Sequence, residues 1–515
     1  MQPWLRLLDQ PGLARSVLIS LGSGLGGTVL ALGAAIVIAA AAGERIVLGA
    51  RGLLLPALLA VPHLASAVGT SFLLAPSGWI VRAFSPWLTG WQRPPDLATV
   101  NDPWGLALTF GLALREAPFL LLALAAARPQ VATARILAVG RTSGYGPIEA
   151  WLKLVLPLLY RQIRLPLYAV LAFALSVVDM AMVLGPSAPP ALAVQALRWL
   201  TDPDPVWHPV GAAAAILQLV LIVVALVLWR MGEWLVARTA RSWLVAGPSR
   251  SIERCLSPLA RIADATVFGI GLAGLVALAL WSVATVWRFP AALPQAFSLA
   301  SWRWAVSGLA TATWTTLAVG VLASLVAVTA VLACLEHEAR AGERPEARVL
   351  ALVYLPLLLP QIAFVQGCQV MLVRLDLDGT LIGLAWLHLV FVLPYTVLML
   401  RGPYLAFAPR WLAAGRSLGR GPAALFVRVR LPLMRRPILV ALAVGFSVSV
   451  AQYLPTLFAA AGRHPTLTTE TLALTQGGDR RLAAVAALLL AALPLLALGG
   501  ALAVPSPRLG HREPD

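Results

Sequence analysis

The sequence has little charge for its length and almost no lysine. Charged residues make up 12% of the 515 residues and hydrophobic residues make up 60%, and the mean hydropathy is +0.84. A soluble globular protein carries about a quarter of its residues as charges, which cover its surface. This chain lacks the charge to do so, and we therefore expect most of its surface to face lipid.

Several chemical signatures are also missing. The three cysteines, Cys255, Cys334 and Cys368, are odd in number and widely spaced, which predicts neither a disulfide framework nor a metal site. The only lysine, Lys153, does not belong to a phosphate-binding Gly-x-x-x-x-Gly-Lys-Ser/Thr loop. We expect this chain to bind no cofactor and no metal, so any energy from ATP must come from another polypeptide.

Long apolar runs dominate the chain. A helix needs about 20 apolar residues to cross the hydrocarbon core of a bilayer. Eleven runs approach or exceed this length, and boundary errors allow ten to twelve. The runs lie at 16–41, 53–75, 104–127, 164–186, 209–230, 264–287, 307–334, 350–373, 379–400, 437–460 and 482–504. The predicted fold class is an all-α polytopic membrane protein.

The net charge of +17 is concentrated in loops between these runs. Arginine gathers in segments 128–163, 231–262 and 401–436, which we predict to be cytoplasmic by the positive-inside rule. Segments 76–103, 187–208 and 461–481 are near charge balance and are predicted to lie outside. This pattern indicates a multi-pass membrane protein rather than a nucleic-acid-binding protein.

The chain contains an internal repeat. Run 16–41 resembles 307–334, and six spans separate equivalent helices, an even number that predicts a parallel duplication. The first half is expected at 1–230 with about five spans, and the second half at 263–515 with about six. Segment 231–262 is the predicted cytoplasmic linker between them.

The repeat is sharpest in two basic loops about 275 residues apart. In each loop, a glycine stands thirteen residues before the proline of a Leu-Pro-Leu. The first copy has Ala138, Gly140, Arg141, Gly144 and Pro157, and the second has Ala413, Gly415, Arg416, Gly419 and Pro432. A short amphipathic helix followed by a glycine turn would form a compact protrusion that a soluble partner can bind.

This spacing resembles the Glu-Ala-Ala loop of the permeases of binding-protein-dependent ABC importers. The whole chain is similar to the fused two-half permeases of the ferric iron, thiamine and sulfate group, nearest to a thiamine-permease-like branch. The resemblance implies coupling helices within 131–145 and 406–420. The first motif position is Ala138 or Ala413 instead of glutamate, so the usual contact of that glutamate with the ATPase is missing.

The same resemblance implies the partners. Two copies of a cytoplasmic ABC ATPase would bind the two loops, and ATP and magnesium would be held on that ATPase. A periplasmic or extracellular solute-binding protein would deliver the solute to the outer face. The chain itself would be a transport subunit within the lipid bilayer and not an enzyme.

A few polar residues fall in or beside the apolar runs. A charge near the bilayer centre costs about 2.5–3.5 kcal/mol on insertion scales, so such residues usually face a bundle interior or a pathway. The candidates for a translocation path are Glu116, Asp179, Gln361, Gln366, Gln452 and Tyr453. They could equally form hydrogen bonds between helices.

The alternative function is a secondary transporter driven by an ion gradient, in which Glu116 and Asp179 would be the coupling residues. The parallel repeat argues against this alternative, because many secondary transporters are built from inverted repeats. The scarcity of paired carboxylates within the spans argues against it as well.

Overall fold

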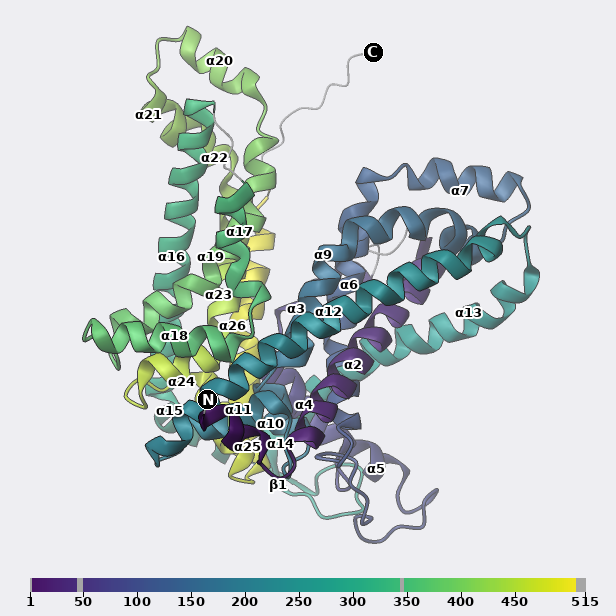
Figure 1. Cartoon of the computed structure of the whole chain (residues 1–515), viewed down its shortest axis with the longest axis vertical. Helices are drawn as coiled ribbons and strands as arrows, with labels where there is room; N and C mark the ends of the chain where they lie inside the picture. Colours follow the sequence, from purple (N-terminus) through teal and green to yellow (C-terminus); the bar gives the residue numbers. More distant parts are fainter. Residues whose placement is uncertain (1, 44–49, 343–346, 506–515) are drawn as a thin grey trace. The chain divides into compact units, whose positions relative to one another are not determined.

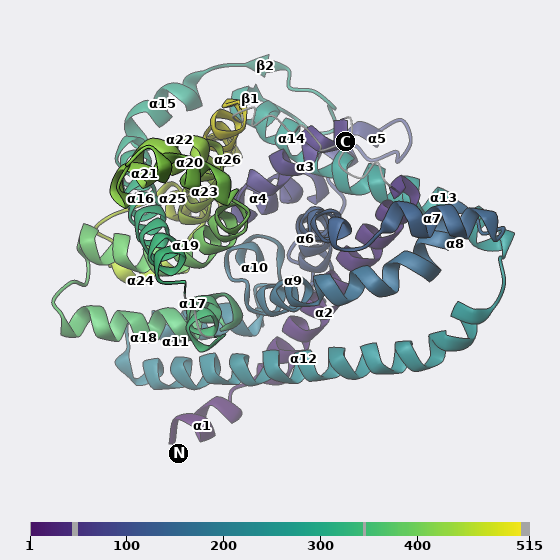
Figure 2. The ribbon, with the colours of Figure 1, turned by 90° about the horizontal axis from the view of Figure 1, so that it is seen from above.

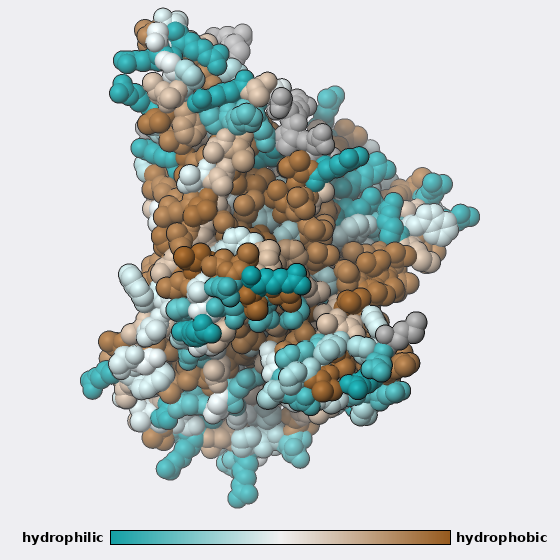
Figure 3. Space-filling model, turned by 60° about the vertical axis from the view of Figure 1, so that its left-hand side comes forward, coloured by the Kyte–Doolittle hydropathy of each residue, from teal (hydrophilic) through white to brown (hydrophobic). Residues whose placement is uncertain are grey.

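The computed structural model describes residues 2–43, 50–342 and 347–505, and nearly all of its regular structure is helical (Figure 1). Within these residues, nine helices are long and apolar enough to cross a membrane, or up to eleven if each of two bent pairs counts as one span. The predicted class is confirmed, and the nine to eleven candidate spans overlap the predicted range of ten to twelve. Hydrophobic side chains cover much of the face in Figure 3.

The chain divides into two compact units. The first comprises Met1–Leu309, Leu357–Gly367 and Glu470–Leu488, and the second comprises Ala310–Pro356, Cys368–Thr469 and Leu489–Asp515. This division by contacts does not follow the sequence duplication, so the predicted halves at 1–230 and 263–515 stay a prediction.

Most helices lie entirely within one or the other of the two units. The first unit holds α1 (Gln2–Leu8), α2 (Leu13–Ala42), α3 (Ala50–Ala60), α4 (His63–Leu74), α5 (Trp79–Phe84), α6 (Leu106–Ala127), α7 (Thr133–Thr142), α8 (Pro147–Ala150), α9 (Leu156–Ser176), α10 (Asp179–Leu184), α11 (Leu192–Leu200), α12 (His208–Val245), α13 (Arg250–Asp264), α14 (Gly271–Val283) and α15 (Ala300–Gly308). A short antiparallel pair, β1 (Ala284–Val286) and β2 (Ala296–Phe297), follows α14.

The second unit has a similar helix order. It holds α16 (Ala310–Ala341), α19 (Leu381–Leu405), α20 (Pro409–Ser417), α21 (Pro422–Leu425), α22 (Leu431–Leu433), α23 (Arg435–Val450) and α24 (Leu454–Ala460). Four helices contain a boundary between the units: α17 (Ala347–Leu358), α18 (Gln361–Arg374), α25 (Leu467–Gln476) and α26 (Arg480–Ala503). Along the chain, the succession from α2 to α12 recurs from α16 to α26, with α13 to α15 between the two series.

The core of the first unit forms where α2, α6 and α9 meet. Gly24 and Gly27 of α2 allow this close packing, because an added Cβ would approach the side chains of Leu175 at 2.6 Å and Leu112 at 2.9 Å. Small residues let membrane helices come together in this way. The core of the second unit lies among α16, α19 and α23, where Val331, Leu400 and Ala441 are buried.

Several runs that the sequence predicts as single helices are broken. Run 53–75 is divided into α3 and α4 just before His63, and run 350–373 into α17 and α18 at Pro360. Proline cannot donate the backbone hydrogen bond that would continue a helix, and it disfavours helical backbone in the preceding residue. Runs 164–186 and 437–460 also break, after α9 and after α23, so the expectation of unbroken helices there was wrong.

Candidate functional site

The first basic loop folds into a short helix, a glycine turn and a second helix. Helix α7 ends at Thr142, and Gly144 follows with φ of +84°, a left-handed conformation that glycine adopts without steric cost. The Gly144 N–H donates to the Arg141 carbonyl (3.1 Å), and the Tyr145 N–H donates to the Gly140 carbonyl (3.1 Å). These two bonds form a Schellman motif, which satisfies the last carbonyls of α7.

The second loop repeats this geometry at the matching positions. Helix α20 ends at Ser417, and Gly419 has φ of +72°. The Gly419 N–H donates to the Arg416 carbonyl (2.9 Å), and the Arg420 N–H donates to the Gly415 carbonyl (3.2 Å). In both loops a four-residue helix beginning with proline follows, α8 or α21, and then a five-residue π-helical stretch, Trp151–Val155 or Phe426–Arg430.

The glycines at the third motif position have a packing role. A Cβ on Gly140 would lie 3.1 Å from the Cβ of Ala150 and 3.0 Å from the side chain of Leu154. A Cβ on Gly415 would run into the side chain of Leu425, which corresponds to Ala150 in the repeat. The first helix of each loop therefore packs directly on the second through a glycine. This contact explains why glycine stands where the Glu-Ala-Ala pattern has alanine.

The two loops differ in what covers them. Helix α20 has no buried residue, and Ala413, Arg416 and Gly419 are exposed. In the first loop, Ala138, Arg141 and Gly144 are also exposed, but the following helix α8 is buried against the chain that leads into α13. Figure 2 shows α7 and α8 beside α13. Pro157 and Pro432 are exposed at the starts of α9 and α22.

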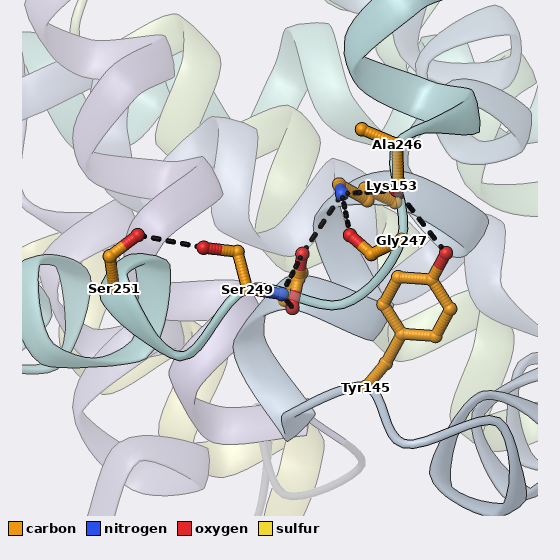
Figure 4. A network of polar contacts seen from close by, with 7 residues as sticks. Tyr145, Lys153, Ala246, Gly247, Ser249 and Ser251 are labelled. Atoms are coloured by element: carbon orange, nitrogen blue, oxygen red, sulfur yellow. Dashed lines mark hydrogen bonds and ion pairs between the residues drawn. The ribbon is translucent and has the colours of Figure 1, made fainter.

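We call residues 246–253 the strap, because this segment is tied to the first loop by a buried polar network (Figure 4). The Lys153 Nζ donates to the carbonyls of Ala246 (2.9 Å) and Gly247 (3.1 Å) and lies 2.9 Å from Glu149 Oε1. The Ser249 N–H donates to both Glu149 oxygens, at 3.0 and 2.8 Å. Both charged side chains are at most 2% exposed.

Further contacts close the strap over the loop. The Ile148 N–H donates to Glu253 Oε1 (2.8 Å), and the Tyr145 hydroxyl donates to the Ala246 carbonyl (3.4 Å). This network was not predicted from the sequence. Two signals were present: the only lysine of the chain, and its spacing of four residues from Glu149, which places both side chains on one helix face.

The second loop is connected to its unit differently. Arg430, at the end of the π-helical stretch, is buried, stacks over the Tyr404 ring at 4.6 Å and pairs with Glu336 of α16. Glu336 also accepts a hydrogen bond from the Tyr404 hydroxyl. The loop is thereby linked to α16 and α19 at its base, while its tip at α20 stays exposed.

The structure brings two of the predicted path residues into one buried cluster in the first unit. Glu116 lies 3.1 Å from His63 Nε2, and the His63 ring packs on Phe173 with ring centroids 4.5 Å apart. Asp179 is buried at the start of α10 and interacts electrostatically with His63. His63 was missed from sequence, although it opens α4 directly after a proline.

The other predicted path residues are spread over both units. Gln361 and Gln366 belong to the first unit, and Gln452 and Tyr453 belong to the second. The Gln452 Nε2 donates to the His388 carbonyl (3.3 Å), and its buried Oε1 has no partner among the described residues. The His388 ring bonds to Ser449 (2.8 Å) and Thr456 (3.0 Å), so this histidine joins three helices of the second unit.

Among the described residues, no group of three or more histidine, cysteine, aspartate or glutamate side chains could hold a metal ion. The three cysteines are free thiols. The candidate functional features are the two exposed loops and the buried polar clusters.

The chain is similar to a known bacterial transport protein. It is 34% identical over 443 residues to the inner membrane ABC transporter permease protein YnjC of Escherichia coli (strain K12), a match that covers 86% of this chain and 78% of that protein. No family model and no solved structure matches the chain. The similarity to this permease and the many helices long enough to cross a membrane show that the chain is a multi-pass inner-membrane protein. It is a transport subunit and not an enzyme, and its partners are ATPase subunits. The chain belongs to the family of inner-membrane ABC transporter permeases.

Proposed function

We propose that the chain is the permease of an ABC importer and that its two basic loops, within 131–145 and 406–420, each bind one copy of a cytoplasmic ATPase. The observation that carries the proposal is the repeated Schellman turn, which projects an exposed short helix in each loop. A pair of identical ATPase subunits requires two equivalent docking elements on one permease chain. The two loops provide them.

The loop chemistry supports docking of a soluble domain. Arg416 and Arg420 are exposed in the second loop, and Arg135 and Arg141 are exposed in the first. Because alanine replaces the motif glutamate, the two exposed loop helices present only positively charged side chains to the ATPase. We therefore expect acidic residues on the ATPase to face these arginines. A short helix lying in a groove is a common recognition mode.

The structure also offers a route for mechanical coupling. A force on α20 passes through the Gly415 contact to α21, and from there through Arg430 to α16. In the first loop, the Gly140 contact links α7 to α8, which continues through the π-helical stretch into α9. Closure of the ATPase pair around ATP would in this way move membrane helices and change access to the solute path.

We further propose that the path includes the cluster of Glu116, His63 and Asp179 and the polar groups of Gln452 and Tyr453. A solute-binding protein would deliver the solute to the outer side, and the solute would belong to the range carried by thiamine, ferric iron and sulfate permeases. An ion-gradient-driven carrier is not retained as the alternative, because the similar protein is an ABC permease.

The test is a pull-down of the tagged chain from native membranes, with quantification of the bound ATPase by mass spectrometry. The wild-type chain should retain about two ATPase copies, and Gly144→Glu and Gly419→Glu should lose them while inserting normally. A side chain at either glycine is strained, because φ is positive. Retention at the wild-type level in both variants would refute the docking assignment.

A matched pair of small substitutions isolates the backbone effect in the second loop. Gly419 and Gly421 are both exposed, and an added Cβ would meet nothing within 4 Å at either position. Gly421 has φ of −70°, so Gly421→Ala is unstrained, whereas Gly419→Ala costs about 1–2 kcal/mol in the left-handed region. Only Gly419→Ala should weaken ATPase retention.

A further inference from the structure

A cluster of arginine and aromatic side chains lies at one end of the first unit, where α5, α14, the β1–β2 hairpin and the start of α26 meet. The Arg82 guanidinium stacks over the rings of Trp281 (5.7 Å), Trp287 (5.1 Å) and Phe289 (5.5 Å). It donates to the carbonyls of Trp287 and Ala291, both at 3.3 Å. Arg82 therefore fixes the turn that carries Trp287.

A second arginine reaches the same tryptophan from a distant part of the chain. Arg480 lies 5.3 Å from the ring centroid of Trp281 and 5.8 Å from that of Phe72. Arg82 and Arg480 thus both stack on Trp281. Two guanidinium groups converge on one aromatic wall, and such stacking holds a cation without neutralising it.

The local charge is not balanced. Asp479 is the acidic residue that lines this site, and its oxygens accept hydrogen bonds from Arg481 and from the Leu482 N–H. Burial raises the pKa of the Asp479 carboxyl, but these hydrogen bonds outweigh burial and lower it, so Asp479 is ionised and paired with Arg481 at neutral pH. Within the described part of the chain, no carboxylate lies within ion-pair distance of Arg82 or Arg480.

Part of this cluster lines an open hollow of about 620 Å³, whose walls include Trp281, Trp287, Arg480 and Arg481. Small-molecule sites typically measure about 300–1,000 Å³. The hollow therefore combines uncompensated positive charge and flat aromatic walls, which together suit an oxyanion attached to a small organic body.

We propose that this hollow is a binding site for an anionic organic solute, whose carboxylate, sulfonate or phosphate group is held by Arg480 beside Trp281 and Trp287. The hollow is lined by residues of 281–287 and 478–481, and the second group belongs to segment 461–481, which the charge pattern places outside the membrane. The site is separate from the ATPase-docking loops and would receive the solute at the outer face. The outer placement rests on the proposed topology, whereas the binding chemistry does not.

The test uses the purified full chain in nanodiscs of zwitterionic phosphatidylcholine, with phenyl phosphate as the probe and phenol as the uncharged analogue. Calorimetric titration at low salt should detect phenyl phosphate and not phenol. Arg480→Gln should weaken phenyl phosphate binding about tenfold or more, as expected for the loss of a charge-assisted contact. Arg93→Gln is the matched control, because Arg93 is an exposed arginine of segment 76–103 that does not line the hollow, and its effect should be less than about threefold.

A second variant keeps the test decisive if Arg480→Gln does not fold. Trp281→Leu removes the aromatic wall on which Arg480 stacks, and it should weaken binding several-fold. Binding that is absent in the wild type, equal in wild type and Arg480→Gln, or equally reduced by Arg93→Gln would overturn the proposal.

The same phosphate chemistry occurs in lipid headgroups, and a second arm distinguishes this source. Nanodiscs that contain anionic phosphatidylglycerol should leave the affinity for phenyl phosphate within about twofold if the site takes a free solute. Loss of binding in these discs would show a lipid site and overturn the solute assignment. ATPase retention in the pull-down is a separate readout, so a failure here does not bear on the docking loops.

Discussion

Removal of the Lys153 ammonium group should release the strap from the first docking loop. This group bridges Glu149 of the loop and the carbonyls of Ala246 and Gly247 in the strap. Lys153→Met keeps most of the side-chain length but leaves the Glu149 carboxylate, whose side chain is 1% exposed, without a cation. The substitution therefore creates a buried, uncompensated charge.

The magnitude follows from this loss. Removal of one partner from a buried ion pair costs about 3–5 kcal/mol. Glu149 keeps its two hydrogen bonds from the Ser249 N–H, so the lower end of that range, about 3 kcal/mol, is expected. Since about 1.4 kcal/mol corresponds to a factor of ten, the strap should open about 100-fold more often.

Hydrogen–deuterium exchange with mass spectrometry measures this opening. The Ser249 amide is bonded to Glu149 and the Ile148 amide to Glu253, so peptides that contain either amide should exchange about 100-fold faster in Lys153→Met. Arg428→Met is the matched control, because Arg428 occupies the corresponding position of the second loop and is exposed. The control should leave exchange in the strap unchanged.

Two results would refute the reasoning. Unchanged exchange in a folded Lys153→Met protein would show that the ion pair does not hold the strap. A double variant with Glu149→Leu provides a further check, because it removes the stranded charge and should recover part of the lost stability. A double variant less stable than the sum of the two single effects would contradict the assigned coupling.

Three further predictions concern other contacts. Gly69→Ala should lower the free energy of unfolding by about 1–3 kcal/mol, measured by thermal denaturation in detergent, because its Cβ would approach the Gly274 backbone at 3.1 Å. Arg430→Met should cost about 1.5–3 kcal/mol in the same assay, since Glu336 loses a charge-assisted hydrogen bond but keeps its ion pair with Arg340 (2.6 Å). Glu116→Gln should reduce ATP-driven solute uptake in proteoliposomes while the pull-down still recovers the ATPase; uptake at the wild-type rate would remove Glu116 from the proposed path.

The sequence was most informative where a local requirement is strict. A left-handed turn needs glycine, and helix starts favour proline, so Gly144 and Gly419 with the prolines after them could be recognised without any structure. Long apolar runs likewise identify membrane spans, because lipid leaves the backbone few other conformations. The helix breaks were also encoded locally, by Pro62 and Pro360, but the apolar pattern alone concealed them.

The sequence by itself therefore determined that this is a helical membrane protein with two matched basic loops. Composition, apolar run length and turn chemistry are properties of neighbouring residues. Only the tertiary structure showed that Glu149 and Lys153 hold the strap, and that Arg82 and Arg480 meet at Trp281. These contacts join residues roughly 100 to 400 positions apart in the chain, and no local pattern specifies which distant partner will cover or pair with a given side chain.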